Sequence, residues 1–305
     1  MASERLTRRR SLGLLAAAAG LPLVLRATRA TAEVVTWRGR ALGAPATLIL
    51  HHPDRAAAER IVAACAAELE RLEGVLSLYR PDSALSELNR AGAMAAPPPE
   101  LVAILDDCRR FHALTAGAFD PTVQPLWRLY AEHFAAGGDP AGPPAARRAD
   151  ALAKVGFDAV HVSPDRIALT RRGMALTLNG IAQGWITDRI ADRLSAAGVA
   201  STLVDMGEIR GVGPHPWQVG VAGTGEVRPL LGGAIATSSP RGFAFDAGGR
   251  FTHIIDPRSG ATPARFARIT VTAPTAAEAD ALSTGFALTE DAVAPAGVAV
   301  ERVAA

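Results

Sequence analysis

The sequence lacks the short motifs that identify the common enzyme classes. It contains no Cys-x-x-Cys pair, no Gly-x-Ser-x-Gly turn, no phosphate-binding P-loop and no Gly-x-Gly-x-x-Gly fingerprint. Its seven histidines show none of the spacings that are typical of zinc sites. These absences direct attention away from the familiar hydrolase, NTPase and dinucleotide-binding patterns. They leave polar residues in glycine-rich turns as the candidates for chemistry.

The chain is also poor in cysteine, with only Cys65 and Cys108. Each of them falls on the apolar stripe of a predicted helix, which favours two buried free thiols. A disulfide between them is the alternative in an oxidising compartment, because the sequence does not give the distance between the two residues.

No basic stretch interleaved with aromatic residues is present, so no nucleic-acid partner is expected. The first 32 residues contain six arginines and one glutamate, a net charge of +5 within a chain whose total is +2. The remaining residues therefore carry a net charge of −3. The basic isoelectric point belongs to the N-terminal segment alone.

That N-terminal segment has the pattern of an export signal. Three arginines at 8–10 precede an apolar run from Leu12 to Leu25, and Ala30 and Ala32 form a small-residue cleavage pattern. The run is too short to span a bilayer of about 30 Å comfortably. We expect a signal over residues 1–32, a functional domain over residues 33–305, export by the twin-arginine route and a periplasmic location. An ordinary secretory signal and an uncleaved anchor are the alternatives.

Strand-like and helix-like segments are interspersed through residues 33–305, without internal repeats. This order predicts an α+β fold, with a mixed β-sheet and helices packed on it. We expect a linker over residues 136–147, where glycine and proline are frequent. The main predicted helices lie near 54–72, 98–116, 185–197 and 276–288, and the main predicted strands near 33–39, 46–52, 201–207, 234–239, 251–255 and 267–273.

The clearest polar pattern is in the segment "PTAAEADALSTGFAL". Thr275 and Glu278 form a capping box that begins a helix, which places Asp280 and Thr284 on one helical face at positions i and i+4. A carboxylate and a hydroxyl at this spacing can bind a hard cation such as Mg²⁺. A solvated or capping aspartate is the simpler alternative.

Two further segments combine polar groups with tight turns. In "THIIDPRSG", the predicted strand Phe251–Ile255 carries His253 to a sheet edge, where it could act as a general base or contact a phosphate. A structural, hydrogen-bonded histidine is the alternative. In "LTLNGIAQGW", Gly180 and Gly184 allow the backbone to approach a ligand, and a carbonyl there can bind Mg²⁺. An ordinary strand-to-helix turn is the alternative.

Taken in order, these segments resemble those of the FAD:protein FMN transferases, the ApbE-type flavin transferases. The similarity extends over nearly all of residues 33–305, and the arginine-containing signal resembles that of exported members, including the accessory transferase of nitrous oxide reduction. The segments that carry it are "ALGAPATL", "SLYRPDSALSELN", "GAFDPTVQPLW", "TLNGIAQGW", "VDMGE", "ATSS", "HIIDPRSG" and "ADALSTG".

The resemblance implies a two-lobed, T-fold-like single domain that binds FAD and Mg²⁺. A Thr or Ser hydroxyl of an acceptor protein would attack the phosphorus on the FMN side, and AMP would leave. The acceptor would be a membrane-bound flavoprotein with a periplasmic flavin-carrying domain. The implied metal ligands are the Gly180 carbonyl, Asp280 and Thr284, and the implied catalytic residue is His253. The implied flavin-site residues are Leu42, Tyr79, Phe119, Asp120, Thr122, Thr177, Gln183 and Ile254.

The sequence departs from the family pattern at two of these positions. The family often has Asp-Leu-Gly-Gly-Ile-Ala-Lys-Gly, whereas Thr177 replaces the Asp here and Gln183 replaces the Lys. The "TLNGIAQG" form resembles that of related exported members. An FAD carrier without transferase activity and a metal-dependent FAD pyrophosphatase are therefore the competing hypotheses, and the retained Asp280, Thr284 and His253 favour catalysis.

Overall fold

The computed structural model describes residues 33–220, 225–289 and 293–305, and the predicted signal over residues 1–32 lies outside them. The strands are β1 (Glu33–Ala41), β2 (Ala44–His52), β3 (Ala93–Ala95), β4 (Val160–Val162), β5 (Arg166–Leu169), β6 (Thr202–Asp205), β7 (Ile209–Val212), β8 (Trp217–Gly220), β9 (Val227–Leu230), β10 (Ala234–Ser238), β11 (Phe266–Ala273) and β12 (Ala299–Ala304). The α-helices are α2 (Arg55–Leu76), α3 (Ala84–Ala91), α4 (Pro99–Leu114), α5 (Gln124–Ala135), α6 (Ala145–Leu152), α7 (Ala182–Ala196) and α8 (Ala276–Phe286).

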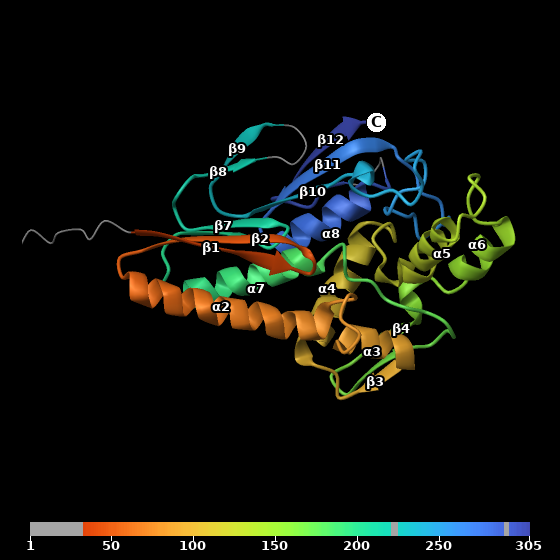
Figure 1. Cartoon of the computed structure of the whole chain (residues 1–305), viewed down its shortest axis with the longest axis horizontal. Coiled ribbons are helices and arrows are strands. Elements are labelled where there is room, and N and C mark those ends of the chain that lie inside the picture. The colour runs from red at the N-terminus through yellow and green to blue at the C-terminus, as the bar shows by residue number, and fades with distance from the viewer. Residues whose placement is uncertain (1–32, 221–224, 290–292) are drawn as a thin grey trace, which may run out of the picture. The chain divides into compact units, whose positions relative to one another are not determined.

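A seven-stranded sheet organises residues 33–305, with the strand order β1-β2-β6-β7-β10-β11-β12 (Figure 1). All of its strand pairs are antiparallel, which differs from the mixed sheet expected from the sequence. Short connections join β1 to β2 and β6 to β7, and such hairpins produce antiparallel neighbours. The long segment between β2 and β6 supplies most of the helices. The α+β class is confirmed.

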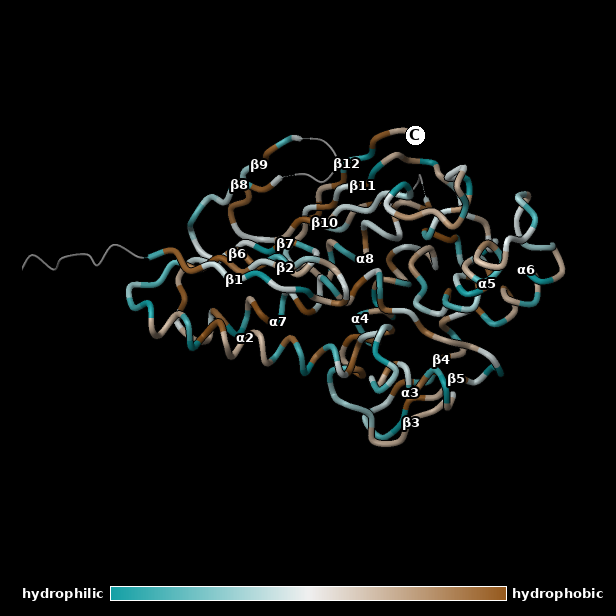
Figure 2. The backbone as a smooth tube through the Cα atoms, in the orientation of Figure 1, coloured by the Kyte–Doolittle hydropathy of each residue, from teal (hydrophilic) through white to brown (hydrophobic). Residues whose placement is uncertain are grey.

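Different elements pack against the two faces of this sheet. On one face, α2, α7 and α8 pack against alternate residues such as Leu48 and Leu50, which belong to the main core. On the other face, Ile49 and Leu203 contact a smaller cluster that includes Trp217 of the β8–β9 ribbon. Strand residues point alternately to opposite faces, so one strand contributes to both clusters. Along the tube of α2, hydrophobic (brown) and hydrophilic (teal) residues recur, as expected of a helix with one buried face (Figure 2).

Helices α5 and α6 form a second, smaller core with the segment that contains Ile255. Tyr130 of α5 anchors this core, because its hydroxyl donates a hydrogen bond of 2.8 Å to the Gly260 carbonyl. The predicted linker over 136–147 is only partly correct, since α6 begins at Ala145. No helix in the described part of the chain has the length and apolar character needed to cross a membrane.

Two local predictions change in the structure. The predicted strand Phe251–Ile255 does not form, and the segment has a single bridge, between Ala244 and Thr252. Helix α7 begins at Ala182, three residues before the predicted start at Trp185. The cysteine prediction is confirmed, because Cys65 and Cys108 are both free and buried.

Candidate active site

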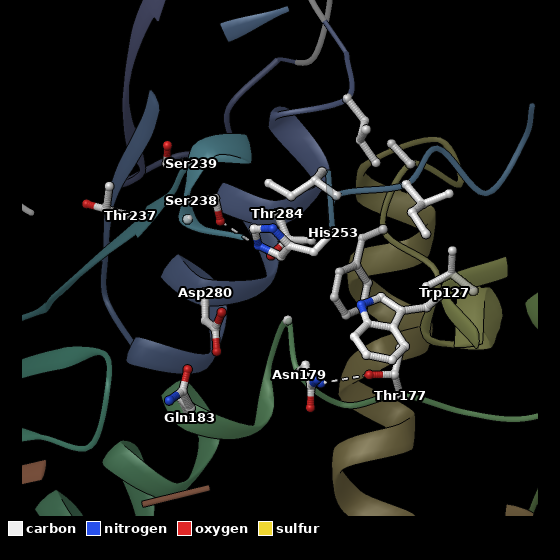
Figure 3. Close-up of a pocket in the computed structure, with 18 of the residues that line it drawn as sticks. Trp127, Thr177, Asn179, Gln183, Thr237, Ser238, Ser239, His253, Asp280 and Thr284 are labelled. Carbon is white, nitrogen blue, oxygen red and sulfur yellow. Dashed lines mark hydrogen bonds between the residues drawn. The ribbon is translucent and has the colours of Figure 1, made fainter. Parts of the chain in front are cut away.

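A pocket with a volume of about 800 Å³ is lined by β10, the start of α7, one face of α8, residues of α5, β11 and β12, and irregular segments that include 253–255 (Figure 3). These elements come from parts of the chain that are distant in sequence. The pocket brings together most of the residues selected from the sequence: Phe119, Asp120, Thr177, Gly180, Gln183, His253, Ile254, Asp280 and Thr284.

A second pocket, of about 400 Å³, adjoins the first and contains the selected residues Leu42 and Tyr79. Asn179 and Gln183 line both pockets. The Asn179 amide donates a hydrogen bond of 3.2 Å to the Tyr79 hydroxyl, which connects the two regions. Because two side chains are shared, the two pockets lie next to each other.

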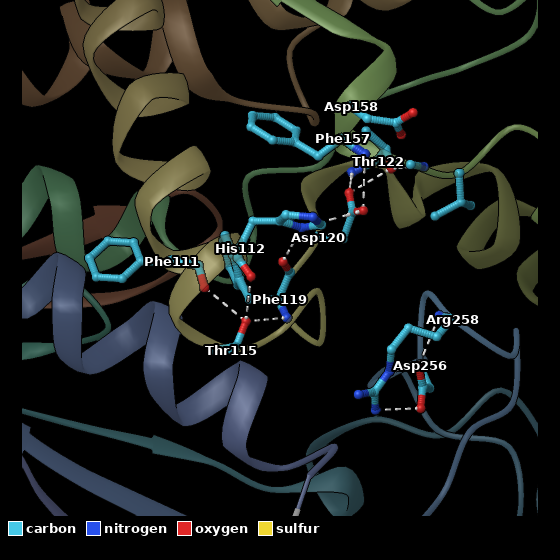
Figure 4. Close-up of polar contacts among 12 residues, drawn as sticks. Phe111, His112, Thr115, Phe119, Asp120, Thr122, Phe157, Asp158, Asp256 and Arg258 are labelled. Carbon is cyan, nitrogen blue, oxygen red and sulfur yellow. Dashed lines mark hydrogen bonds and ion pairs between the residues drawn. The ribbon is translucent and has the colours of Figure 1, made fainter. Parts of the chain in front are cut away.

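Thr122 is the one selected residue that lies on neither pocket. Its side chain is fully buried, donates a 2.6 Å hydrogen bond to Asp120 and accepts one of 2.7 Å from the Gly156 amide (Figure 4). The Asp120 carboxylate also accepts from the backbone amide of Phe157 at 3.2 Å. Burial raises the pKa of Asp120, and the hydrogen bonds from Thr122 oppose that rise. These two side chains therefore fix the loop that forms one side of the pocket.

The first turns of α7 and α8 are held by two carboxylates, one from each helix, which accept hydrogen bonds from backbone amides of the other helix. Asp280 of α8 accepts a hydrogen bond of 3.0 Å from the Gly184 amide in the first turn of α7. Asp188 of α7 accepts hydrogen bonds of 2.9 Å from the amides of Ala276 and Ala277 at the start of α8. The first-turn amides of a helix have no partner within the helix. Each helix thus satisfies the unpaired amides of the other.

Gly184 makes this close packing possible. A Cβ atom at that position would lie 2.2 Å from the Ala276 carbonyl oxygen, a distance at which the two helices would have to separate. Gly184 is therefore required for the α7–α8 junction rather than for contact with a ligand.

Gly180 has a different role, because it faces Thr284. A Cβ atom at position 180 would lie 3.0 Å from the Thr284 hydroxyl oxygen, so any side chain would crowd that hydroxyl. The backbone of Gly180 and the side chains of Asp280 and Thr284 all line the same pocket. Their oxygen atoms form a set that suits a hard cation such as Mg²⁺.

Within residues 33–220, 225–289 and 293–305, no group of three or more His, Cys, Asp or Glu side chains could hold a metal. A Mg²⁺ site here would therefore combine one carboxylate with a hydroxyl and a carbonyl. Mg²⁺ is commonly bound through one or two carboxylates together with phosphates of the substrate. The residues present fit that mode of binding.

The electrostatics of the pocket also favour a cation. Burial raises the pKa of Asp280 to about 7, with a smaller contribution from the negative charge of Asp188. Glu208 lines the same pocket, and burial with the nearby charges of Asp280 and Asp205 raises its pKa well above the usual range. A bound divalent cation would favour the ionised carboxylates and so counteract the rise of both pKa values.

Sequence reasoning did not select Glu208, although it ends the matched segment "VDMGE". The sequence signal that could have identified Glu208 is an acidic side chain directly after a glycine. In the structure that glycine, Gly207, has a φ of +106°, which favours glycine. The site also contains Trp127, Asn179, Ser238 and Arg241, none of which was selected.

His253 lies on an irregular segment rather than on the predicted strand. Its Nδ1 atom is 2.9 Å from the Phe243 carbonyl oxygen, and its backbone amide donates to the same oxygen at 3.2 Å. A carbonyl can only accept, so Nδ1 carries the proton and Nε2 has a free lone pair. Burial lowers the pKa of His253, which favours the neutral ring. The ring lines the same pocket as Thr284.

Comparison with known proteins identifies similar sequences and structures. The ApbE family model matches residues 40–304. The FAD:protein FMN transferase of Haemophilus influenzae is 29% identical over 302 residues, covering 90% of this chain and 86% of the relative. The FAD:protein FMN transferase of Treponema pallidum is 32% identical over 249 residues, covering 71% of this chain and 67% of the relative.

Solved structures show the same fold. The apo flavinyl transferase ApbE of Pseudomonas stutzeri has a TM-score of 0.73 at 24% identity, covering 90% of this chain and 95% of that structure. The ApbE protein of Thermotoga maritima has a TM-score of 0.72 at 25% identity, covering 84% of this chain and 87% of that structure. The predicted α+β fold is confirmed by this agreement.

Proposed function

We propose that this chain, which belongs to the ApbE family, is a flavinyltransferase that moves FMN from FAD to a Thr or Ser hydroxyl of an acceptor protein. The reaction would depend on Mg²⁺ and release AMP. The observation that carries this proposal is the convergence of the Gly180 backbone, Asp280, Thr284 and a neutral His253 on one pocket. The adjoining pocket gives a dinucleotide room for its second end.

His253 would take the proton of the acceptor hydroxyl through Nε2. As that proton moves to His253, the hydroxyl oxygen forms a bond to the phosphorus on the FMN side of FAD. The bond from that phosphorus to the oxygen bridging the two phosphates breaks, and AMP leaves with that oxygen. The hydrogen bond from Nδ1 to the Phe243 carbonyl keeps Nε2 available and stabilises the ring when it becomes positively charged.

Asp280, Thr284 and the Gly180 carbonyl would hold Mg²⁺ in this mechanism. When bound, the ion supplies a Lewis acid that offsets the negative charge of the pyrophosphate. Asp280 is suited to this role because its other interaction, with the Gly184 amide, fixes the orientation of the carboxylate. The Gly180 position leaves the Thr284 hydroxyl uncrowded.

Thr177 and Gln183 would contact FAD, although both lack the charge that is frequent at these positions in the family. The two replacements remove one negative and one positive charge, so the local net charge stays the same. The Gln183 amide packs against Gly207, where a Cβ atom would lie 2.3 Å from Nε2. Gln183 therefore also positions the loop that leads to Glu208.

Mass spectrometry tests the transfer reaction directly. A candidate acceptor is incubated with this chain, FAD and Mg²⁺, and its mass and modified residue are determined. A mass gain of one FMN on a Thr or Ser supports the proposal. Release of FMN and AMP without acceptor modification would identify an FAD pyrophosphatase, and unchanged FAD would identify a carrier.

We also propose that the chain acts in the periplasm, as an exported member resembling the accessory transferase of nitrous oxide reduction, on a membrane-bound acceptor. The sequence of residues 1–32 supports export by the twin-arginine route. Replacing Arg8, Arg9 and Arg10 by Lys should retain the precursor in the cytoplasm, as measured by fractionation and immunoblotting. An unchanged periplasmic yield would support an ordinary secretory signal instead.

A further inference from the structure

Three hydroxyl groups form a continuous chain beside the proposed cation site. The Ser283 hydroxyl donates a hydrogen bond of 2.9 Å to the Asp280 carbonyl oxygen. The Ser238 hydroxyl at the end of β10 lies 2.7 Å from the Ser283 hydroxyl and 3.5 Å from the Thr284 hydroxyl. Ser238 therefore connects β10 to Ser283 and Thr284 of α8. Figure 3 shows the Ser238 and Thr284 side chains.

The direction of each hydrogen bond follows from the number of protons. A hydroxyl has one proton to donate and two lone pairs that accept, whereas a carbonyl only accepts. Ser283 donates its proton to the Asp280 carbonyl oxygen, so in its contact with Ser238 it can only accept, and Ser238 is the donor. Because Ser238 donates its one proton to Ser283, it can only accept from Thr284, and Thr284 is the donor.

We propose that Ser238 is a positioning residue for the cation site and that it accepts the Thr284 proton. The Thr284 oxygen then presents its lone pairs away from Ser238, toward the pocket. This inference rests on the proposed role of Thr284 as a metal ligand. Ser238 also lines the pocket.

The length of the Ser238–Thr284 contact sets the size of the expected effect. An oxygen–oxygen distance of 3.5 Å is longer than the usual range of about 2.5–3.0 Å for a hydrogen bond between hydroxyls, so this contact is weak in the metal-free chain. When a hydroxyl oxygen binds a cation, its proton becomes more acidic, and the hydrogen bond that this proton makes becomes stronger. Loss of the acceptor should therefore weaken cation binding by about threefold to tenfold.

Ser239 provides a matched control, because it is the next residue and lines the same pocket. Its hydroxyl donates a hydrogen bond of 2.8 Å to the Ala267 carbonyl oxygen and is not part of the chain of hydroxyls. Removing the Ser239 hydroxyl changes the polarity of the pocket without affecting Thr284.

The experiment measures binding of Mn²⁺, as a probe for Mg²⁺, to the metal-free chain by calorimetry. We expect Ser238→Ala to raise the Kd by about threefold to tenfold, and Ser239→Ala to leave it unchanged. Thr284→Ala should weaken binding more than either. In a Thr284→Ala background, Ser238→Ala should have no further effect, because Ser238 acts through Thr284.

The outcomes separate this inference from the proposed function. If Thr284→Ala binds Mn²⁺ like the unmodified chain, the proposed metal site is wrong. If Thr284→Ala weakens binding but Ser238→Ala does not, or if Ser239→Ala has an equal effect, only the role of Ser238 is overturned. Thermal melting checks the fold of each variant. If Ser238→Ala does not fold, Ser238→Cys asks the same question with a group of similar size that accepts weakly, and unchanged affinity would again overturn the role.

Discussion

The two sides of the large pocket are built in different ways. The helical side consists of α7, α8 and the end of β10, and backbone amides fixed by Asp188 and Asp280 hold it together. The loop side contains His253 and is held by aromatic packing, such as the stacking of Phe243 on Trp127 with ring centroids 6.4 Å apart. The proposed metal ligands lie at the helical side, and the proposed proton acceptor lies on the loop side.

This difference matches the demands of the two roles. A cation needs several oxygens at fixed distances, and regular elements provide more precise positions than loops do. A proton acceptor needs one correctly oriented atom and an acceptor hydroxyl within reach. The Phe243 carbonyl provides that orientation for His253 without a strand. Changes on the helical side should therefore alter metal dependence, and changes on the loop side should alter proton transfer.

The largest effect should come from Asp280→Ala on the helical side. This change removes the only carboxylate of the proposed ligand set and the acceptor of the Gly184 amide. We expect Mg²⁺-dependent transfer to be abolished, as measured by FMN incorporation into an acceptor. Asp280→Asn retains an oxygen for Gly184 and should keep weak metal affinity. If Asp280→Ala transfers FMN at the original rate, Asp280 is not a metal ligand, and the two sides of the pocket do not differ in the way proposed.

His253→Ala on the loop side should lower the transfer rate by about 10²–10⁴, the usual contribution of a proton-transfer residue. FAD affinity, measured by fluorescence quenching on the same preparation, should stay near that of the unmodified chain. The Mg²⁺ concentration for half-maximal rate should also be unchanged. A loss of rate that is fully explained by weaker FAD binding would show that His253 is structural.

Gly180→Ala should give a smaller effect that is specific to the helical side. The new Cβ atom would lie 3.0 Å from the Thr284 hydroxyl oxygen, which must then shift by a few tenths of an ångström. We expect the Mg²⁺ concentration for half-maximal transfer to rise by about tenfold, the change that 1.4 kcal/mol produces. Gly74→Ala is the control, because no atom lies near its added Cβ. Equal Mg²⁺ dependence in both variants would contradict the proposed ligand set.

The smallest effect concerns pH and again tests the loop side. Burial lowers the pKa of His253 below its usual value of 6.5, and only the neutral ring can accept a proton. The rate should therefore stay high as the pH falls to 6.5 and decline only below it. A pH profile of kcat/KM for the acceptor measures this decline of the rate at acidic pH, which should be absent from the residual activity of His253→Ala. If the decline persists in the variant, it is caused by the titration of another group.

The same contrast explains which parts of the structure could be predicted from sequence. The predicted start of α8 at Thr275 is confirmed, because the Thr275 side chain accepts from the Glu278 amide at 3.3 Å. Once the start of the helix was fixed, its periodicity placed Asp280 and Thr284 on one face. Local signals were sufficient for this part of the site.

The loop side could not be derived in this way. The segment Phe251–Ile255 was predicted to be a strand, but Phe251 instead packs with Tyr130 and Phe134 of α5. Glu208 was missed because nothing near it in sequence shows that it faces Asp280. Thr122 fitted a family segment, yet its hydroxyl is used within the protein. Each of these outcomes depends on contacts between segments that are distant in sequence.

The reciprocal carboxylate–amide hydrogen bonds between α7 and α8 have a consequence for biosynthesis. The Gly184–Asp280 bond joins residues 96 positions apart, and the Ala276–Asp188 bond joins residues 88 positions apart. While the chain is still emerging from the ribosome, a nascent protein that ends before residue 276 has neither the ligands of α8 nor a partner for the first turn of α7. A truncated translation product therefore contains the proposed flavin-site residues but not Asp280 and Thr284 of the proposed cation site, and that site can be complete only after both have been synthesised.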